Sequence, residues 1–89
     1  ECYRIGLANR VVAPEAVLEE AMELARRLAK GPGLAIGMTK KMIWQEWSMD
    51  LDAAIEQEAQ AQALLLRAYD HREFYDAWNE KREPKFEGR

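Results

Sequence analysis

Apolar residues recur with helical spacing between positions 14 and 30. One face of the predicted helix carries Val17, Ala21, Leu24, Ala25 and Leu28, in the i, i+4, i+7, i+8, i+11 pattern. Glutamates lie in the opening turns and basic residues in the closing turn, which suits the partial charges at the two ends of a helix. The pattern predicts a helix over residues 14–30, which the sequence Gly31-Pro32-Gly33 ends.

The next two apolar runs predict two more helices. The second begins near Pro32, a residue that fits the first helical position, and continues toward Trp44 and Trp47. Its apolar positions are Leu34, Ile36, Met38, Met42 and Ile43. Either Ser48 or Asp50 can cap the third helix. The stripe predicted for this third helix comprises Leu51, Ile55, Ala59, Gln62, Leu66 and Tyr69.

A fourth helix is predicted from Asp70 to Pro84. Asp70, followed three residues later by Glu73, has the spacing of a capping box, in which side chains satisfy N–H groups at the start of a helix. Phe74 and Trp78 lie one turn apart on this helix. Pro84 ends it and leaves residues 85–89 as a tail.

The first residues of the chain have a different pattern. Only Tyr3-Arg4-Ile5 and Asn9-Arg10-Val11-Val12 have strand-like sequences, and a short strand needs a partner strand elsewhere. We therefore predict a mainly α fold with about four helices and one short N-terminal strand-like piece. The first twelve residues have the pattern expected for the end of a larger unit.

Composition excludes several classes of partner. The 89 residues include 13 Lys and Arg and 16 Asp and Glu, a net charge of −3, so no basic surface favours nucleic acid or an anionic membrane. No apolar stretch approaches the ~20 residues that span a bilayer. The single cysteine, Cys2, indicates a reducing compartment. We expect a cytoplasmic protein with no nucleic-acid and no membrane partner.

Few residues could carry nucleophilic or metal chemistry. Cys2 and His71 are each the only residue of their type, and a solvated side chain in the first turn of the fourth helix explains His71. One histidine and scattered carboxylates have no recognised ligand spacing, so we expect no metal site. Segment 31–37 has GxGxxxG spacing but follows a helix and contains Pro32, which favours a helix break over a phosphate loop.

Glu58 and Gln62 lie one turn apart on the third helix and interrupt its apolar stripe. A buried polar side chain needs a partner, so Gln62 would bond across a helix interface or toward a ligand. The structural interpretation is favoured, because small residues that suit close helix packing lie nearby: Ala53, Ala54, Ala59, Ala61 and Ala63.

Several motifs follow one another in a familiar order. The first motif is Gly6-Leu7-Ala8-Asn9-Arg10-Val11-Val12, and the series continues through Pro14, Gly31-Pro32, Thr39-Lys40 and the Glu58 and Gln62 pair. It ends with Asp70-x-x-Glu73, Ala77 and Glu80-Lys81-Arg82-x-Pro84-x-Phe86-x-Gly88. This order, and above all the ending, resembles the crotonase superfamily, the enoyl-CoA hydratase/isomerase enzymes. The resemblance covers nearly all 89 residues.

The resemblance implies the C-terminal helical segment of a crotonase-like α/β spiral fold. Residues 1–13 would be the end of the core domain, a turn and strand-like segment, and residues 14–89 a C-terminal helical oligomerisation segment. The oxyanion hole and the acid/base carboxylates of the family belong to segments upstream of this match. We assign no catalytic residue here and expect the chain to be inactive alone.

The resemblance also implies partners. The complete enzyme would act on an acyl-CoA, with CoA as part of the substrate and no separate cofactor, and would form a homo-oligomer, a trimer or a dimer of trimers. Lys81 matches the family lysine that reaches the phosphates of CoA bound to a neighbouring subunit; the alternative is a solvated lysine at a polar helix end. For the whole chain, the alternative is a free-standing α-helical protein-interaction module with no CoA role.

Overall fold

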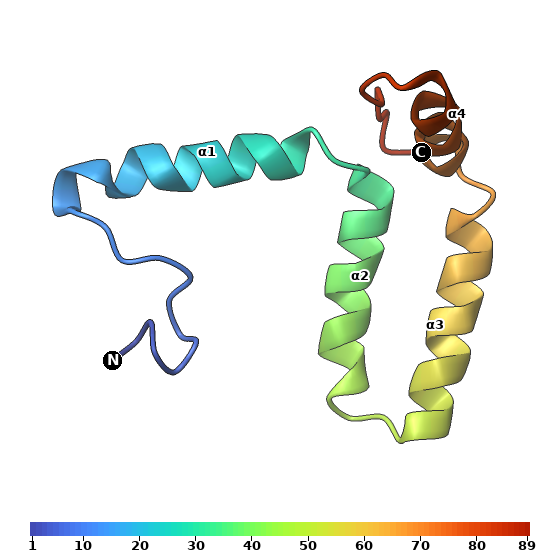
Figure 1. Cartoon of the computed structure of the whole chain (residues 1–89). Coiled ribbons are helices and arrows are strands. Elements are labelled where there is room, and N and C mark those ends of the chain that lie inside the picture. The colour runs from blue at the N-terminus through green and yellow to red at the C-terminus, as the bar shows by residue number, and fades with distance from the viewer.

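Four α-helices make up most of the structure, a computed structural model that describes residues 1–89. A 3-10 turn, Pro14–Ala16, leads into α1 (Val17–Ala29), which is followed by α2 (Gly33–Glu46), α3 (Leu51–Leu65) and α4 (Tyr69–Glu80) (Figure 1). All four predicted helices are present, and the mainly α fold class is confirmed. None of them has the length and apolar character needed to span a membrane.

The helix α1 forms where its amphipathic pattern predicted it. It ends at Ala29, and the chain then turns sharply so that α1 points away from the other helices (Figure 1). Gly31 permits this turn, because a Cβ atom there would lie 2.9 Å from Cδ1 of Ile36 and 3.2 Å from the carbonyl oxygen of Leu28. The glycine-rich segment is thus a helix break, as predicted.

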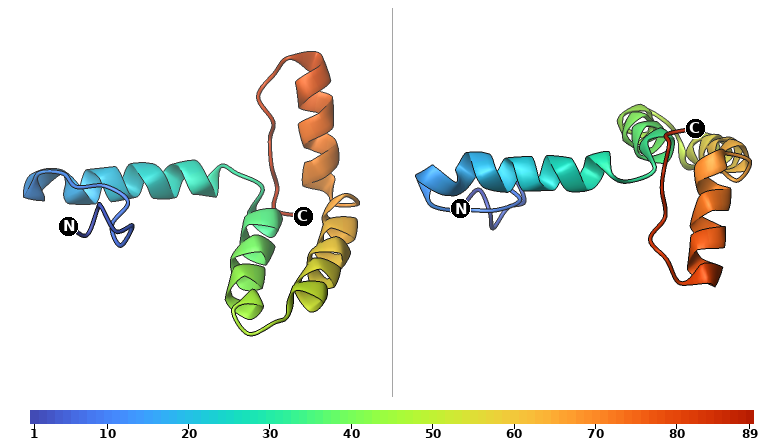
Figure 2. Two further views of the ribbon diagram at one scale, coloured as in Figure 1. Left: turned by 60° about the horizontal axis from the view of Figure 1, so that its bottom comes forward. Right: turned by 90° about the horizontal axis from the view of Figure 1, so that it is seen from above.

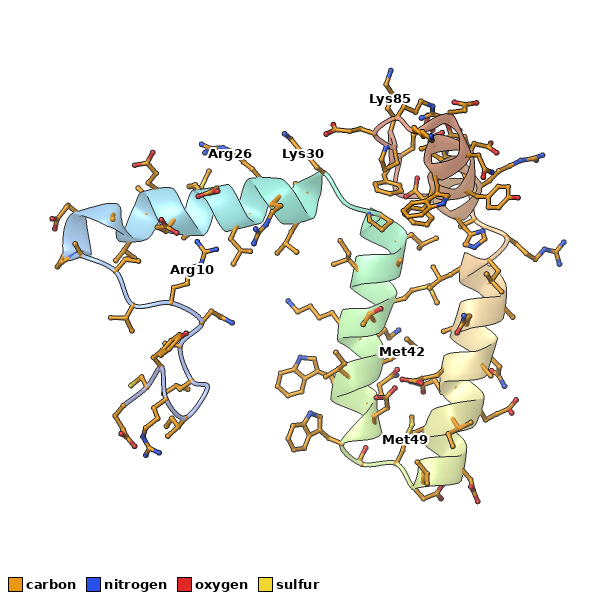
Figure 3. The ribbon with its side chains drawn as sticks, in the orientation of Figure 1. Arg10, Arg26, Lys30, Met42, Met49 and Lys85 are labelled. Atoms are coloured by element: carbon orange, nitrogen blue, oxygen red, sulfur yellow. The ribbon has the colours of Figure 1, made fainter.

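Small side chains bring α2 and α3 together as an antiparallel pair (Figure 1). Ala61 is only 6% exposed, and Ala54 and Leu65 on the same face of α3 are half-buried. Met42 and Met49 fill the space between the two helices (Figure 3). Alanines let two helix backbones approach closely, and flexible methionines fill the irregular gaps that remain.

The prediction that the apolar stripe is the buried face of α3 is wrong. Leu51, Ile55 and Leu66 are 74%, 56% and 52% exposed, and Tyr69 belongs to α4. The alanine face contacts α2 instead, so Leu51, Ile55 and Leu64 of α3 remain exposed.

Asp50 is the cap of α3. Its Oδ1 accepts a hydrogen bond from the backbone N–H of Ala53 at 2.8 Å. The hydroxyl of Ser48 donates to the carbonyl oxygen of Gln45 at 3.1 Å and so serves the end of α2. Of the two residues that could cap α3 from the sequence, Asp50 therefore caps the start of α3, and Ser48 bonds to the end of α2.

The strand-like piece at the N-terminus is not a strand. No residue of the chain is in a strand, and residues 2–6 form turns. A single extended segment has no neighbour with which to exchange the backbone hydrogen bonds of a sheet. Arg10 of this segment forms an ion pair with Glu20 of α1. The domain boundary between residues 13 and 14 stays a prediction.

The C-terminal tail folds back along α4 (Figure 2). The predicted capping box is wrong, because the N-cap is Ala68 and Asp70 lies inside the first turn. Asp70 and Glu73, 4% and 9% exposed, share a face of α4 with Ala77 and bind the returning tail. The helix ends at Glu80, four residues before Pro84, because Lys81 adopts a left-handed backbone conformation.

Candidate functional site

Lys81 lies at the turn where α4 ends and the tail begins. Its backbone has φ 54° and ψ 42°, and the N–H of Arg82 donates to the carbonyl oxygen of Ala77 at 3.0 Å, as in a Schellman motif. The Lys81 side chain is exposed and takes part in none of the ion pairs of the chain. Its ammonium is therefore free to meet an anion.

The neighbouring cation, Arg82, is neutralised by two glutamates. Its two terminal nitrogens donate to the two carboxylate oxygens of Glu73 at 2.6 and 3.1 Å, and its Nε donates to Glu80 at 2.5 Å. The Arg82 hydrogen bonds, followed by the backbone N–H of Lys85, lower the pKa of Glu73 from its ordinary value of 4.5 to about 2. The hydrogen bonds to Glu73, followed by the one to Glu80, raise the pKa of Arg82. Arg82 thus has a structural partner on α4, whereas Lys81 has none.

Two buried carboxylates hold the tail along α4. Glu73 accepts the backbone N–H of Lys85 at 2.7 Å, and Asp70 accepts those of Glu87 and Gly88 at 2.7 and 2.9 Å. In return, the N–H of Asp70 donates to the carbonyl oxygen of Arg89 at 3.0 Å. The two ends of the tail are therefore fixed at two successive turns of one helix face.

A small apolar hollow lies beneath the tail. It has a volume of about 220 Å³ and lies where the start of α2, the end of α3 and α4 meet Phe86 of the tail. His71 and Phe74 contribute to its wall from α4. The His71 side chain remains exposed, as the sequence predicted.

The other residues that the sequence singled out do not gather into a site. Gln62 is exposed and its side chain forms no hydrogen bond; the polar contact across the α2 and α3 interface runs instead from the Gln57 side chain to the Gln45 side chain at 3.2 Å. Cys2 is exposed, far along the chain from α4. No three His, Cys, Asp or Glu side chains come close enough to hold a metal ion.

The tail anchor is the functional feature that the sequence analysis missed. Asp70, Glu73 and Ala77 have i, i+3, i+7 spacing, so a buried face was visible in the pattern. In the sequence, the two acids on that face have the spacing of a capping box, while the exposed side of α4 carries Phe74 and Trp78, whose ring centroids lie 6.4 Å apart. The helix buries its acids because the tail supplies them with donors.

Comparison with known proteins covers the whole chain. The family model for enoyl-CoA hydratase/isomerase matches residues 1–89. The crotonyl-CoA hydratase of Syntrophomonas wolfei is 36% identical over 86 residues, which are 97% of this chain and 33% of that protein. The 2,3-dehydroadipyl-CoA hydratase of Escherichia coli is 33% identical over 89 residues, 100% of this chain and 35% of that protein.

A solved structure has the same arrangement of helices. A Streptomyces coelicolor protein assigned as an enoyl-CoA hydratase superposes with a TM-score of 0.96 and 46% identity, over 100% of this chain and 32% of that one. The chain thus spans about a third of the length of the relatives that it matches.

Proposed function

Because the chain belongs to the enoyl-CoA hydratase/isomerase family, we propose that the complete protein converts an acyl-CoA thioester, adding water across its double bond or shifting that bond. The names of the two curated relatives differ in the acyl group and share the CoA thioester. CoA is part of the substrate, and no separate cofactor is needed. The catalytic groups come from parts of the enzyme outside this segment, which itself supplies none.

The helices serve assembly of a homo-oligomer, a trimer or a dimer of trimers. Large apolar side chains remain exposed on every helix, among them Ile43, Trp44 and Trp47 on and after α2, at 55%, 74% and 84%. These three side chains lie within about one turn of one another, and a group of exposed apolar side chains favours contact with another protein surface. A free-standing interaction module would enclose its own core, whereas these helices bury only Ala61 and Ala77 among their apolar residues.

Lys81 contributes to the CoA site by binding a phosphate. The observation that carries this assignment is the contrast within Glu80-Lys81-Arg82: Arg82 is neutralised by Glu73 and Glu80, and Lys81 is exposed without an ion pair. A free ammonium on an otherwise acidic protein is suited to hold a phosphate through charge-assisted hydrogen bonds.

The test is Lys81→Ala in the complete enzyme. Loss of one charge-assisted hydrogen bond of about 1.5–3 kcal/mol should weaken acyl-CoA binding roughly 10- to 150-fold. KM should rise more than kcat falls, because a remote phosphate is held about equally in the ground state and the transition state. Truncated thioesters that lack the phosphates should be affected less.

Lys30→Ala is the matched control. Lys30 is also an exposed lysine at the C-terminal end of a helix, α1, so it has the same favourable interaction with the helix dipole. The phosphate contact predicts that only Lys81→Ala raises KM. Equal KM values for Lys81→Ala and the parent enzyme at low salt, where screening is weakest, would leave Lys81 as a solvated lysine.

A further inference from the structure

We propose that Glu73 is the positioning residue for Lys81, an inference that rests on the phosphate contact proposed above. Glu73 does not form an ion pair with the Lys81 side chain; it binds two residues that follow Lys81, Arg82 and Lys85. Its carboxylate holds the Arg82 guanidinium at 2.6 and 3.1 Å and the Lys85 backbone N–H at 2.7 Å. The turn that carries Lys81 is thereby tied to the helix two turns earlier.

The backbone at Lys81 needs such an anchor. A left-handed conformation is unfavourable for a residue with a Cβ atom and persists where surrounding contacts impose it. Lys81 is the only residue other than glycine with a positive φ in the chain. The backbone hydrogen bond from Arg82 to Ala77 imposes this conformation, and the Glu73–Arg82 ion pair holds the same residue through its side chain. Loss of the ion pair would let residues 81 and 82 populate other conformations, and the long Lys81 side chain would start from a different point in each.

Glu73 and Glu80, the two glutamates that bind Arg82, differ in their exposure and in their place on α4. Glu73 is 9% exposed and comes from the body of α4, so its bonds relate the turn to the helix. Glu80 is two residues from Arg82 at the helix end, and its side chain is 62% exposed. The Glu80 pair therefore joins two residues of the same turn and leaves the position of that turn unconstrained.

Asp70 serves a different part of the tail. It accepts the N–H groups of Glu87 and Gly88, several residues beyond Lys81. Asp70 thus fixes the end of the chain, and Glu73 fixes the segment that follows Lys81 directly.

The experiment is a double-mutant cycle in the complete enzyme, with acyl-CoA kinetics as the readout. Glu73→Gln removes the charge that orients Arg82, and Glu80→Gln is the matched control, since it removes the other partner of the same arginine. Glu73→Gln should raise KM for the CoA substrate about threefold to tenfold, with KM rising more than kcat falls. In the Lys81→Ala background it should raise KM no further, because there is no ammonium left to position. Glu80→Gln should change KM by less than about twofold in both backgrounds.

The outcomes separate the two proposals. If Lys81→Ala raises KM and Glu73→Gln adds its full effect on top, Glu73 acts independently of Lys81 and the positioning role is overturned. If Lys81→Ala leaves KM unchanged, the phosphate contact itself fails, and the positioning role fails with it. Should Glu73→Gln prevent folding, Arg82→Gln breaks the same pair from its more exposed side and must show the same coupling to Lys81.

Discussion

Glu73 keeps its negative charge at a position that is 9% exposed, because three hydrogen-bond donors replace the water that it loses. Two come from Arg82 and one from the backbone of Lys85. The carboxylate of Asp70 likewise accepts hydrogen bonds from two backbone N–H groups of the tail. A buried carboxylate without such partners is strongly unfavourable, so the tail and the acids of α4 depend on each other.

Acid should weaken the contact between Glu73 and the tail only at very low pH. The pKa of Glu73 is lowered from 4.5 to about 2, first by Arg82 and then by the Lys85 N–H, so folding favours its ionised form. Its contribution to tail docking is complete above pH 4.5 and is lost as the pH falls through about 2. The Lys85 amide resonance of lysine-labelled protein should therefore titrate with a midpoint well below 4.5 in NMR.

The Arg82→Gln variant provides the control for that titration. Without the guanidinium, the largest cause of the lowered pKa is gone, and the midpoint should move upward toward the ordinary value. A midpoint already near 4.5 in the parent protein would show that the ion pair does not form in solution.

The ends of the helices contain residues whose side chains stabilise the fold. Asp50 is the only residue whose side chain caps an α-helix at its N-terminus, and it does so with a bond of 2.8 Å to Ala53. Asp50→Ala in the complete protein should lower the free energy of unfolding by about 1 kcal/mol, within a range of ~0.5–2. The measurement is urea denaturation with the same slope for both proteins.

Ser48→Ala is the control for the cap. Ser48 lies in the same connection between α2 and α3 but donates to the carbonyl of Gln45 and caps no N–H group. Ser48→Ala should lower the free energy of unfolding by well under half as much as Asp50→Ala does. Equal losses for the two variants would mean that the connection, and not the cap, sets the stability.

The helices were predictable, because each depends on local spacing, whereas their contacts were not. The α1 helix and the break at Gly31 follow from residues within one or two turns of each other. The α3 face was misjudged because the choice between its alanines and its larger apolar residues depends on α2, which the spacing does not reveal. The role of Glu73 depends on Arg82 and Lys85 returning to it after a turn. Lys81 was found through its motif, and its freedom from ion pairs became visible only in the structure.

The whole molecule has almost no interior. Only Ala61, Asp70, Glu73 and Ala77 are buried, and the radius of gyration is 16.8 Å. A compact domain of this length would have a radius of about 12 Å. The extension of α1 away from the α2 and α3 pair accounts for the shape (Figures 1 and 2). The exposed apolar side chains of these helices therefore need surfaces from outside the chain in order to be covered.

The isolated 89-residue chain should consequently not behave as a well-folded monomer. An intact domain of this size has about 4–13 kcal/mol of stability, and that stability comes mainly from a buried core, which this chain lacks. Exposed apolar faces should drive association instead. Sedimentation should show species larger than a monomer, and the emission of Trp44, Trp47 and Trp78, which are 74–84% exposed, should shift to the blue as concentration rises.

Substitution of the most exposed aromatic residues tests the cause of that association. Trp44→Gln combined with Trp47→Gln removes two side chains that are 74% and 84% exposed around the end of α2, and association should weaken. Lys40→Gln combined with Lys41→Gln, on the same helix, is the matched control and should leave it unchanged. A concentration-independent monomer with one cooperative melting transition would show that the helices find enough stability among themselves. The exposed faces would then not explain why this segment occurs within proteins about three times its length.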